Sequence, residues 1–323
     1  MKEISIVIPS KDEEITIAKC IESVENALEG VRSYEIILVD SYSSDRTVEI
    51  ATKYPIKILR LRQGWPISPS AGRYIGSINS HGKYIFFLDA DMVVDKDWIK
   101  KGLEILEKDH SLAGVTGLLF NILPFDKVNK RRLIRHPIGY VKYLPGTAIY
   151  RRSIIEEVNH FNPFLMGYEE RELGYRITER GYKLIRLKDA ISYHFAKEQN
   201  LRELHEKSRY FIGVGQFLRL HFTIENLYEI AKTYHLILWT NLFLLMFFIS
   251  FILSILTGNF ILPKITSAFA LFLCITLIIR HRNIKKSCLF VYGLFSKSLN
   301  IVYGFLKKTK KFNEYPLDVE IIK

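Results

Sequence analysis

The stretch Tyr84-Ile85-Phe86-Phe87-Leu88-Asp89-Ala90-Asp91 decides the fold, because a run of large apolar and aromatic residues ends in two carboxylates. Short runs of this kind are typical of strands that are buried on both faces of a sheet. In open α/β sheets, ligands bind at the carboxyl ends of the strands. Asp89 and Asp91 are therefore candidate ligands of a divalent cation, Mg²⁺ or Mn²⁺. The alternative is that these acids only cap the helix predicted from Asp97, a role that suits Asp95 better.

Three earlier runs predict further buried strands, at residues 4–8, 35–39 and 56–61, and helix-like stretches at 13–27 and 45–53 alternate with them. Alternation of this kind predicts an α/β fold with parallel strands and helices on both faces of the sheet. Beyond Lys108 the pattern is looser. It predicts strands at 113–121, 147–150, 185–187 and 191–194, and a helix that begins near Glu169.

The charge of the chain is unevenly distributed. Its 46 Lys+Arg against 34 Asp+Glu give a net charge of +12, yet no acidic residue lies between Ile230 and Asn313. The basic excess thus accompanies the most apolar part of the chain, which indicates a membrane surface. We expect no nucleic-acid partner, since the first part of the chain carries no aromatic-basic motif. Three cysteines without metal-ligand spacing favour a reducing environment.

Two apolar segments are long enough to span a bilayer core of about 30 Å. Leu236–Leu256 carries no charge, and Phe260–Ile279 carries only Lys264 near its start. They predict a transmembrane hairpin, and the basic residues at 280–286 favour the cytoplasmic side for both of its ends. The segment Cys288–Leu306 is interrupted by Ser296-Lys297-Ser298, so we prefer an interfacial helix over a third span.

Three more segments occupy fixed places beside the predicted strands. Val7-Ile8-Pro9-Ser10-Lys11-Asp12-Glu13-Glu14 follows the first strand, Leu38-Val39-Asp40-Ser41-Tyr42-Ser43-Ser44-Asp45-Arg46-Thr47 follows the second, and Gly64–Gly76 precedes the strand that ends at Asp89. In this order they resemble the nucleotide-sugar-binding half of family 2 glycosyltransferases, which have the GT-A fold. Gly146-Thr147-Ala148-Ile149-Tyr150-Arg151-Arg152 and Gly167-Tyr168-Glu169-Glu170-Arg171-Glu172-Leu173 resemble the acceptor half. The resemblance implies a Rossmann-like mixed sheet with helices on both faces.

The resemblance also implies how the donor is bound. Asp40 would accept hydrogen bonds from the nucleotide base, while Pro9, Ser10 and Glu14 would line the base and the ribose. Arg73 would contact the diphosphate or help to shape its pocket. The family usually has a second acid after the position of Asp40, and this chain has Ser41 there.

The metal site follows from the same resemblance. Asp91 would be the principal ligand of Mg²⁺ or Mn²⁺, and Asp89 would contact the ribose or the metal. His194 matches a position where some members of the family place a further metal ligand. The alternative, which we weigh equally, is that His194 lies at an interface with its hydrogen bonds satisfied and binds no metal.

On the acceptor side, the family motif has an aspartate as catalytic base where this chain has Glu170, and a glutamate can do the same work. Glu169 and Glu172 are alternatives for this role. On a helix these two lie three residues apart on one face, while Glu170 points elsewhere. The alternative to a catalytic role is that the acidic cluster only begins a helix, where negative charge suits the helix dipole. The acceptor-side candidates are Gly146, Thr147, Glu172 and Arg176.

These implications define an enzyme and its partners. We expect a membrane-anchored, metal-dependent, inverting glycosyltransferase that moves a sugar from a nucleotide-diphospho-sugar to a hydroxyl of a polyprenyl- or dolichyl-linked saccharide. Transfer to the phosphate of the carrier is the alternative, although an anionic phosphate needs no base. A non-catalytic nucleotide-binding membrane protein is a second alternative, but such a protein has no use for a base.

The expected organisation has four parts. Residues 1–200 form the GT-A domain, divided into a nucleotide-sugar half at 1–110 and an acceptor half at 111–200. Amphipathic interfacial helices follow at 201–234, two transmembrane helices at 235–280, and a basic interfacial region at 281–323. We expect an integral protein of the cell membrane whose catalytic domain lies on the cytoplasmic face.

Overall fold

The computed structural model describes residues 2–122, 131–132, 137–195, 201–258, 260–261, 263–268 and 282–323. The chain divides into two compact units, of which the first comprises residues 1–198 and 310–323 and the second residues 199–309. The sequence assigns all of 281–323 to an interfacial region, whereas the structure groups 310–323 with the first unit.

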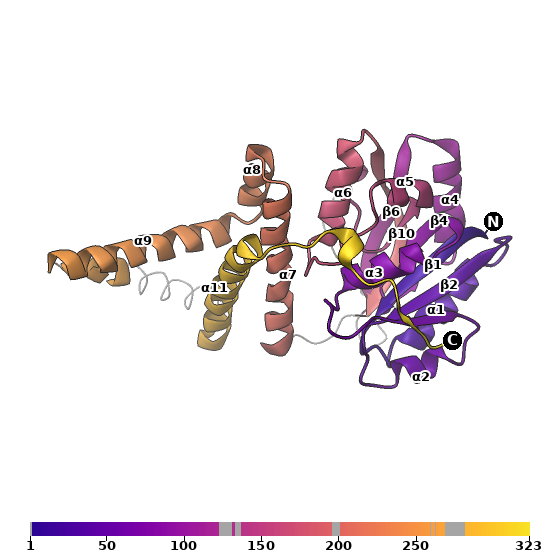
Figure 1. Cartoon of the computed structure of the whole chain (residues 1–323), viewed down its shortest axis with the longest axis horizontal. Coiled ribbons are helices and arrows are strands. Elements are labelled where there is room, and N and C mark those ends of the chain that lie inside the picture. Colours follow the sequence, from indigo (N-terminus) through magenta and orange to yellow (C-terminus); the bar gives the residue numbers. More distant parts are fainter. Residues whose placement is uncertain are drawn as a thin grey trace. The chain divides into compact units, whose positions relative to one another are not determined.

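A single mixed sheet forms the centre of the first unit, with the strand order β11-β3-β2-β1-β4-β9-β6-β10-β5 (Figure 1). Its first half consists of β1 (Lys2–Ser10), β2 (Tyr34–Asp40), β3 (Lys57–Arg60) and β4 (Gly82–Phe87). These strands run parallel, as their alternation with helices predicts. Their carboxyl ends therefore lie along one edge of the sheet.

β5 (Met92–Val94) also lies in the nucleotide-sugar half, and the acceptor half supplies β6 (Leu112–Ile122), β7 (Arg131–Arg132), β8 (Gly139–Val141), β9 (Ala148–Arg151) and β10 (Lys183–Phe195). β9 is antiparallel to both β4 and β6, which makes the sheet mixed. The sequence predicts two closing strands where the structure has only β10. Register shifts after Arg186 and Ala190 interrupt the periodicity along this strand and explain the difference.

Helices cover both faces of the sheet (Figure 1). They are α1 (Ile17–Ala27), α2 (Thr47–Ala51), α3 (Pro69–Ile78), α4 (Trp98–Lys108), α5 (Arg152–Glu157) and α6 (Glu169–Glu179). Because successive side chains of a strand point to opposite faces, Ile6 and Ile8 of β1 belong to the core under α1 and α4. Val7 belongs to the opposite core, under α3, α5 and α6.

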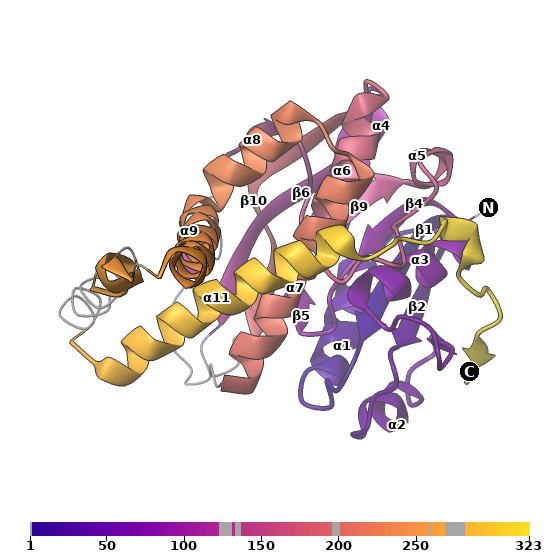
Figure 2. The ribbon, with the colours of Figure 1, turned by 60° about the vertical axis from the view of Figure 1, so that its left-hand side comes forward.

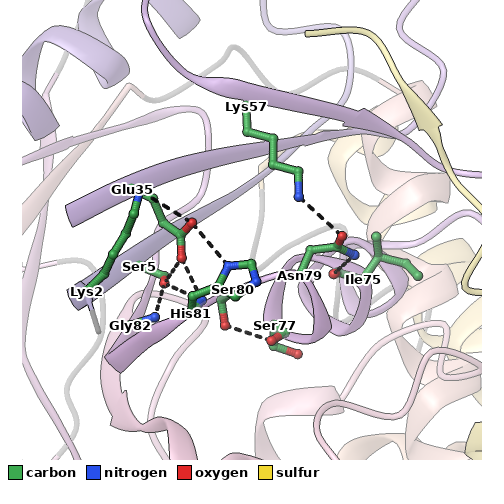
Figure 3. Close-up of polar contacts among 10 residues, drawn as sticks. All are labelled: Lys2, Ser5, Glu35, Lys57, Ile75, Ser77, Asn79, Ser80, His81 and Gly82. Atoms are coloured by element: carbon green, nitrogen blue, oxygen red, sulfur yellow. Dashed lines mark hydrogen bonds and ion pairs between the residues drawn. The ribbon is translucent and has the colours of Figure 1, made fainter.

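Hydrogen bonds fasten the amino ends of three strands together (Figure 3). The Glu35 carboxylate accepts from the Ser5 hydroxyl at 2.6 Å and from the backbone N–H of His81 at 2.6 Å. Burial raises the pKa of Glu35, but these hydrogen bonds outweigh it and leave the pKa below its usual value. The contacts align β1, β2 and β4 at the edge opposite the candidate site.

The last residues of the chain return to the first unit, where η1 (Phe312–Glu314) and β11 (Glu320–Ile321) lie. β11 pairs antiparallel with β3 and forms the edge of the sheet. Tyr315 is 2% exposed, and its hydroxyl donates to the carbonyl of Pro66 at 2.9 Å. Its ring contacts the rings of Trp65, Tyr74 and Phe164. This segment is a packed part of the domain.

The second unit is helical, with α7 (Leu201–Leu220), α8 (Ile224–Thr233), α9 (His235–Thr257) and α11 (Ile284–Leu306) among its described residues (Figure 2). α7 and α11 approach each other closely at glycines. A Cβ on Gly215 of α7 would lie only 2.0 Å from the carbonyl oxygen of Ile301 on α11. Ser296 and Asn300 donate hydrogen bonds to Ser208 of α7. Small residues and interhelical hydrogen bonds are typical of helices that associate in membranes.

One described helix, Ser287–Leu306, is long and apolar enough to cross a membrane, by length and composition only. The predicted span at Leu236–Leu256 coincides with α9, of which Leu245–Thr257 forms a shorter apolar helix by the same measure. Residues 269–281 lie outside the described residues, so the second span of the predicted hairpin and the start of the basic segment stay predictions.

Candidate active site

The candidate site begins at the edge where the parallel strands end. Ser10 of β1, Asp40 of β2 and Arg60 of β3 are register partners across this edge. On the other side of β1, β4 ends at Phe87, and Asp89 follows two residues later. The structure thus brings segments far apart in the sequence to one edge, where α/β sheets bind ligands.

Two loops at this edge are joined by hydrogen bonds. Backbone N–H groups of Asp12, Glu13 and Glu14 donate to the side chains of Ser43, Thr47 and Asp45, at 3.0, 2.7 and 3.0 Å. Asp12 has a left-handed backbone with φ of 53°, and its carboxylate accepts from the N–H of Ser44 at 2.7 Å. The polar run at 43–47 therefore holds the loop after β1 in place.

Asp40 is engaged inside the protein. Its side chain is fully buried, one oxygen accepts from Arg60 Nε at 2.9 Å, and the other accepts from the N–H of Ser43 at 3.1 Å. The expected contact between Asp40 and a nucleotide base stays a prediction. Sequence reasoning did not identify Arg60, because nothing in the motif indicates which strand supplies the partner of Asp40.

The other expected donor residues differ in their surroundings. Pro9 is buried against α3, where a Cβ on Gly72 would lie 3.0 Å from the Pro9 Cβ. Ser10 is 4% exposed, and its hydroxyl has no hydrogen-bond partner among the described residues. Glu14 pairs with Arg46 at 3.3 Å near the surface. Of these three, Ser10 offers an unused polar atom.

Arg73 connects the donor half of the site to the acceptor half. This side chain is 3% exposed, and it donates to Asp89 at 2.5 Å and to Glu169 at 2.9 Å. Both terminal nitrogens of the guanidinium are occupied by carboxylates, so Arg73 joins Asp89 to Glu169. Gly146 is required beside this pair, because a Cβ there would lie 2.2 Å from Arg73 Nη2 and 3.1 Å from Asp89 Oδ2.

The acidic cluster at the start of α6 separates into different environments. Burial raises the pKa of Glu169 despite the attraction of Arg73, and one oxygen of this carboxylate has no partner among the described residues. Burial and then the charge of Glu169 raise the pKa of Glu170 to about 8, although Glu170 stays partly exposed. Tyr168, just before the helix, has a left-handed backbone with φ of 63°. Backbone strain of this kind is often found at functional sites.

Glu172 and Arg176 form a separate pair. Both oxygens of the buried Glu172 accept from Arg176, at 2.8 and 2.7 Å, and Arg176 also donates to the carbonyl of His160 at 2.8 Å. The pair ties α6 to the turn that follows α5. Thr147 is 1% exposed, and its hydroxyl has no hydrogen-bond partner among the described residues. This hydroxyl is therefore unused, whereas Glu172 and Arg176 are hydrogen-bonded to each other.

Asp91 and His194 lie together as the sequence predicts. β5 pairs antiparallel with β10, which brings His194 Nε2 to 3.0 Å from Asp91 Oδ2. Each side chain is 25% exposed, and a hydrogen bond to the Asp91 carboxylate raises the pKa of His194. A carboxylate oxygen suits Mn²⁺ or Mg²⁺, whereas an imidazole nitrogen favours Mn²⁺ over Mg²⁺. The described residues contain no group of three or more metal-ligating side chains, so a cation here would need ligands from its substrate.

The sheet, the acids at its strand ends and the Arg73 network define a glycosyltransferase of the GT-A fold. The chain belongs to the family described as Glycosyl transferase family 2, which matches residues 5–169.

Two relatives and one solved structure illustrate the range of this family. A "Dolichyl N-acetyl-alpha-D-glucosaminyl phosphate 3-beta-D-2,3-diacetamido-2,3-dideoxy-beta-D-glucuronosyltransferase" of Methanococcus voltae is 24% identical over 97% of this chain and 99% of its own. A "Dolichol-phosphate mannosyltransferase" of Pyrococcus furiosus is 30% identical over 115 residues. The matched part makes up 34% of this chain and only 32% of that relative. Mannosyltransferase PcManGT of Pyrobaculum calidifontis, solved with GDP-Man and Mn²⁺, has a TM-score of 0.60 at 15% identity, covering 94% of this chain and 87% of its own.

Proposed function

We propose that this glycosyltransferase is membrane-anchored, metal-dependent and inverting, and that it transfers a sugar from a nucleotide-diphospho-sugar to a hydroxyl of a polyprenyl- or dolichyl-linked saccharide. The observation that carries the proposal is the Asp89–Arg73–Glu169 network, which joins the end of β4 to the start of α6. The network joins two parts of the candidate site. One is the segment after β4 that contains the metal candidate Asp91, and the other is α6, which carries the base candidate Glu170.

On this proposal, Asp91 and His194 hold the cation, and Asp89 contacts the ribose or the cation. A divalent cation at this position neutralises the charge that develops on the departing diphosphate. The donor set fits, since the two side chains are adjacent, partly exposed and able to offer one oxygen and one nitrogen. Ser10, with its unused buried hydroxyl, lines the ribose.

The reaction forms one bond and breaks one. The acceptor hydroxyl oxygen bonds to the anomeric carbon, while the bond from that carbon to the diphosphate oxygen breaks and its electron pair leaves with the nucleoside diphosphate. The hydroxyl proton passes to Glu170, which acts as general base. A partly exposed carboxylate whose pKa is about 8 suits this role, because a base works best when its pKa is near the operating pH. Attack opposite the leaving group inverts the anomeric configuration.

A lipid-linked acceptor is supported by two independent observations. The uncharged segment Leu236–Leu256, which is long enough to span a bilayer core of about 30 Å, lies in the helix α9, and the names of the relatives include dolichol and dolichyl phosphate. Transfer to the phosphate of the carrier is the second candidate, favoured by the name of the Pyrococcus relative. Transfer to a hydroxyl is preferred, since a phosphate supplies its own negative charge and leaves Glu170 without a role.

Attachment to the membrane by α9, the following apolar segment and the basic residues near 280–286 places the catalytic domain at the cytoplasmic face. The amphipathic segment 201–234 and the region from 281 would then lie near the interface.

The test uses the full-length protein in detergent, incubated with labelled nucleotide sugars, Mn²⁺ and a lipid extract. We expect label in the lipid fraction, loss of transfer with excess chelator, and loss in Asp91→Asn without a change in melting temperature. Mild acid cleaves a glycosyl phosphate more readily than a glycosidic linkage, so label released as a monosaccharide indicates transfer to the carrier phosphate, and label released within a larger saccharide indicates transfer to a hydroxyl. Full transfer in excess chelator would contradict the metal assignment.

A further inference from the structure

Residues 310–315, drawn in yellow in Figure 1, contact both α3 and α6. The hydroxyl of Tyr74 on α3 donates to the carbonyl of Phe312 at 3.2 Å. The guanidinium of Arg176 on α6 lies over the Phe312 ring, 5.1 Å from its centre. Phe312 therefore links a helix of the nucleotide-sugar half to a helix of the acceptor half.

Further contacts anchor these residues to the nucleotide-sugar half. The ammonium group of Lys310 lies 4.5 Å from the centre of the Trp65 ring. The buried side chain of Tyr315 contacts the same ring, and its hydroxyl donates to the carbonyl of Pro66 at 2.9 Å. Trp65 and Pro66 lie in the loop that leads into α3. The position of Phe312 is thus set by the loop and the helix before β4.

On the side of α6, the guanidinium of Arg176 is held around its edge. It donates to both oxygens of Glu172, at 2.8 and 2.7 Å, and to the carbonyls of His160 and Val158. Each of its three nitrogens therefore has an acceptor. A cation within about 6 Å of an aromatic centre is attracted by the electrons of the ring. Because the edge of Arg176 is held, the contact between its face and the Phe312 ring bears directly on α6.

α3 and α6 are thereby linked at two separate points. Glu169 begins α6, where it pairs with Arg73, and Arg176 lies about two turns, or about 10 Å, further along the same helix. Arg73 and Tyr74 are neighbours on α3. The apolar side chains that pack α6 in the core are attracted without a preferred direction. Two directional contacts fix the tilt of α6, whereas the ion pair alone would let it pivot.

We propose that Phe312 is a positioning residue for sugar transfer: by joining α6 to α3, it sets the direction from which Glu170 approaches the acceptor hydroxyl. This inference rests on the proposed function, in which Glu170 is the general base. The side chain of Glu170 points about 100° around the helix from that of Glu169, so a tilt of α6 about its first contact turns the Glu170 carboxylate. A base must lie within hydrogen-bond distance of the proton that it accepts, so a misdirected carboxylate slows transfer.

The test measures transfer and nucleotide binding separately, on the full-length protein in detergent with Mn²⁺ and a lipid extract. The donors are labelled UDP-GlcNAc, UDP-glucose and GDP-mannose. Phe312→Leu keeps an apolar side chain and removes the ring over which Arg176 lies. We expect turnover at saturating donor to fall by about tenfold, less than the about 10² that a displacement near 1 Å can cost. The dissociation constant of UDP or GDP should stay within about twofold of wild type, since the variant leaves the strand ends and the metal candidates unchanged.

Two further variants separate positioning from stability. Phe312→Tyr keeps the aromatic ring, and residue 312 is only half-buried, so turnover should stay within about twofold of wild type. Tyr315→Phe is the matched control, since it removes the hydrogen bond to Pro66 in the same segment and keeps the ring over which Arg176 lies. It should lower the melting temperature and leave turnover unchanged.

Wild-type turnover in Phe312→Leu overturns the positioning role while leaving the glycosyltransferase intact. An equal loss in Phe312→Tyr contradicts it as well, because the ring would then not be the cause. The same holds for an equal loss in Tyr315→Phe, since stability alone would then govern turnover, and for a loss of nucleotide affinity that parallels the loss of turnover. If wild type transfers no sugar from any of the donors, the proposed function is contradicted and this inference falls with it.

Discussion

Arg73 pairs with one of the two neighbouring acids that are candidates for the base. It holds one oxygen of Glu169 at 2.9 Å, and this carboxylate is only 6% exposed. Glu170 is partly exposed, and no such ion pair is shown for it among the described residues. The sequence leaves both residues open as the base, because adjacent acids in one motif look alike until their partners are known.

Glu170→Gln tests the base. At low pH, protonated Glu170 cannot accept the hydroxyl proton, so wild-type kcat/KM should rise as the pH rises towards about 8. The amide variant should lose this rise and about 10² to 10⁴ in turnover, with donor affinity near wild type. Glu169→Gln is the comparison, because it weakens the contact with Arg73. If the pH profile moves only in Glu169→Gln, the base is Glu169; if neither variant slows transfer, the acceptor is the carrier phosphate.

Gly146→Ala tests the network around Arg73. A single added methyl group would lie 2.2 Å from Arg73 Nη2, so the guanidinium must move away from Asp89. A displacement near 1 Å in a site of this kind can cost about 10² in rate, and we expect that loss in kcat. Gly293→Ala is the control, since a Cβ at Gly293 meets nothing within 4 Å and removes only a helix glycine. Equal activity of the two variants would contradict a catalytic need for this geometry.

Recognition of the motif could not show how Asp40 and Arg60 pair. Asp40 lies at a predicted strand end, and the structure places it there. Its burial depends on β3, a strand of four residues whose arginine looks like any surface charge in the sequence. A resemblance transfers the position of a residue, whereas its exposure depends on neighbours that differ between members of a family.

At the scale of elements, the buried strands are the best predicted part. The predicted strands at 4–8, 35–39 and 84–88 match β1, β2 and β4 to within a few residues, because each is a short run of branched and aromatic side chains. Helix starts are less well predicted. The sequence places the first helix from Glu13, but α1 begins at Ile17, since the N–H groups of Glu13 and Glu14 are bound by the loop after β2.

Two helices show why composition alone misleads. The glycine-rich segment before β4 is not predicted as a helix, yet it forms α3. Its Gly76 packs against β1, where a Cβ would lie 2.2 Å from Val7 Cγ1. Its glycines serve close packing on the sheet. The polar interruption at 296–298 suggests an interfacial helix, yet Ser296 donates to Ser208 of α7, so part of this polarity is satisfied between helices.

At the scale of the whole molecule, the chain leaves the first unit at residue 198 and returns at residue 310. Local periodicity cannot reveal such a return, since Tyr315 and β11 have no pattern that distinguishes them from a loose basic tail. The structure shows that Tyr315 fills a pocket between Trp65, Tyr74 and Phe164. The first unit therefore includes both parts of the chain.

Truncation tests whether the first unit requires both parts. The fragment 1–198 lacks Tyr315 and β11, so Trp65 and Tyr74 lose a buried partner and β3 becomes an exposed edge. Removing one large buried aromatic side chain costs about 3–5 kcal/mol, a large part of the about 5–15 kcal/mol that stabilises a typical domain. Residues 1–198 joined to 310–323 by a flexible Gly/Ser linker should restore the melting temperature and UDP or GDP binding, and the same linked protein with Tyr315→Ala should lose most of that gain. Equal melting temperatures for the fragment and the linked protein would show that the C-terminal segment adds no stability.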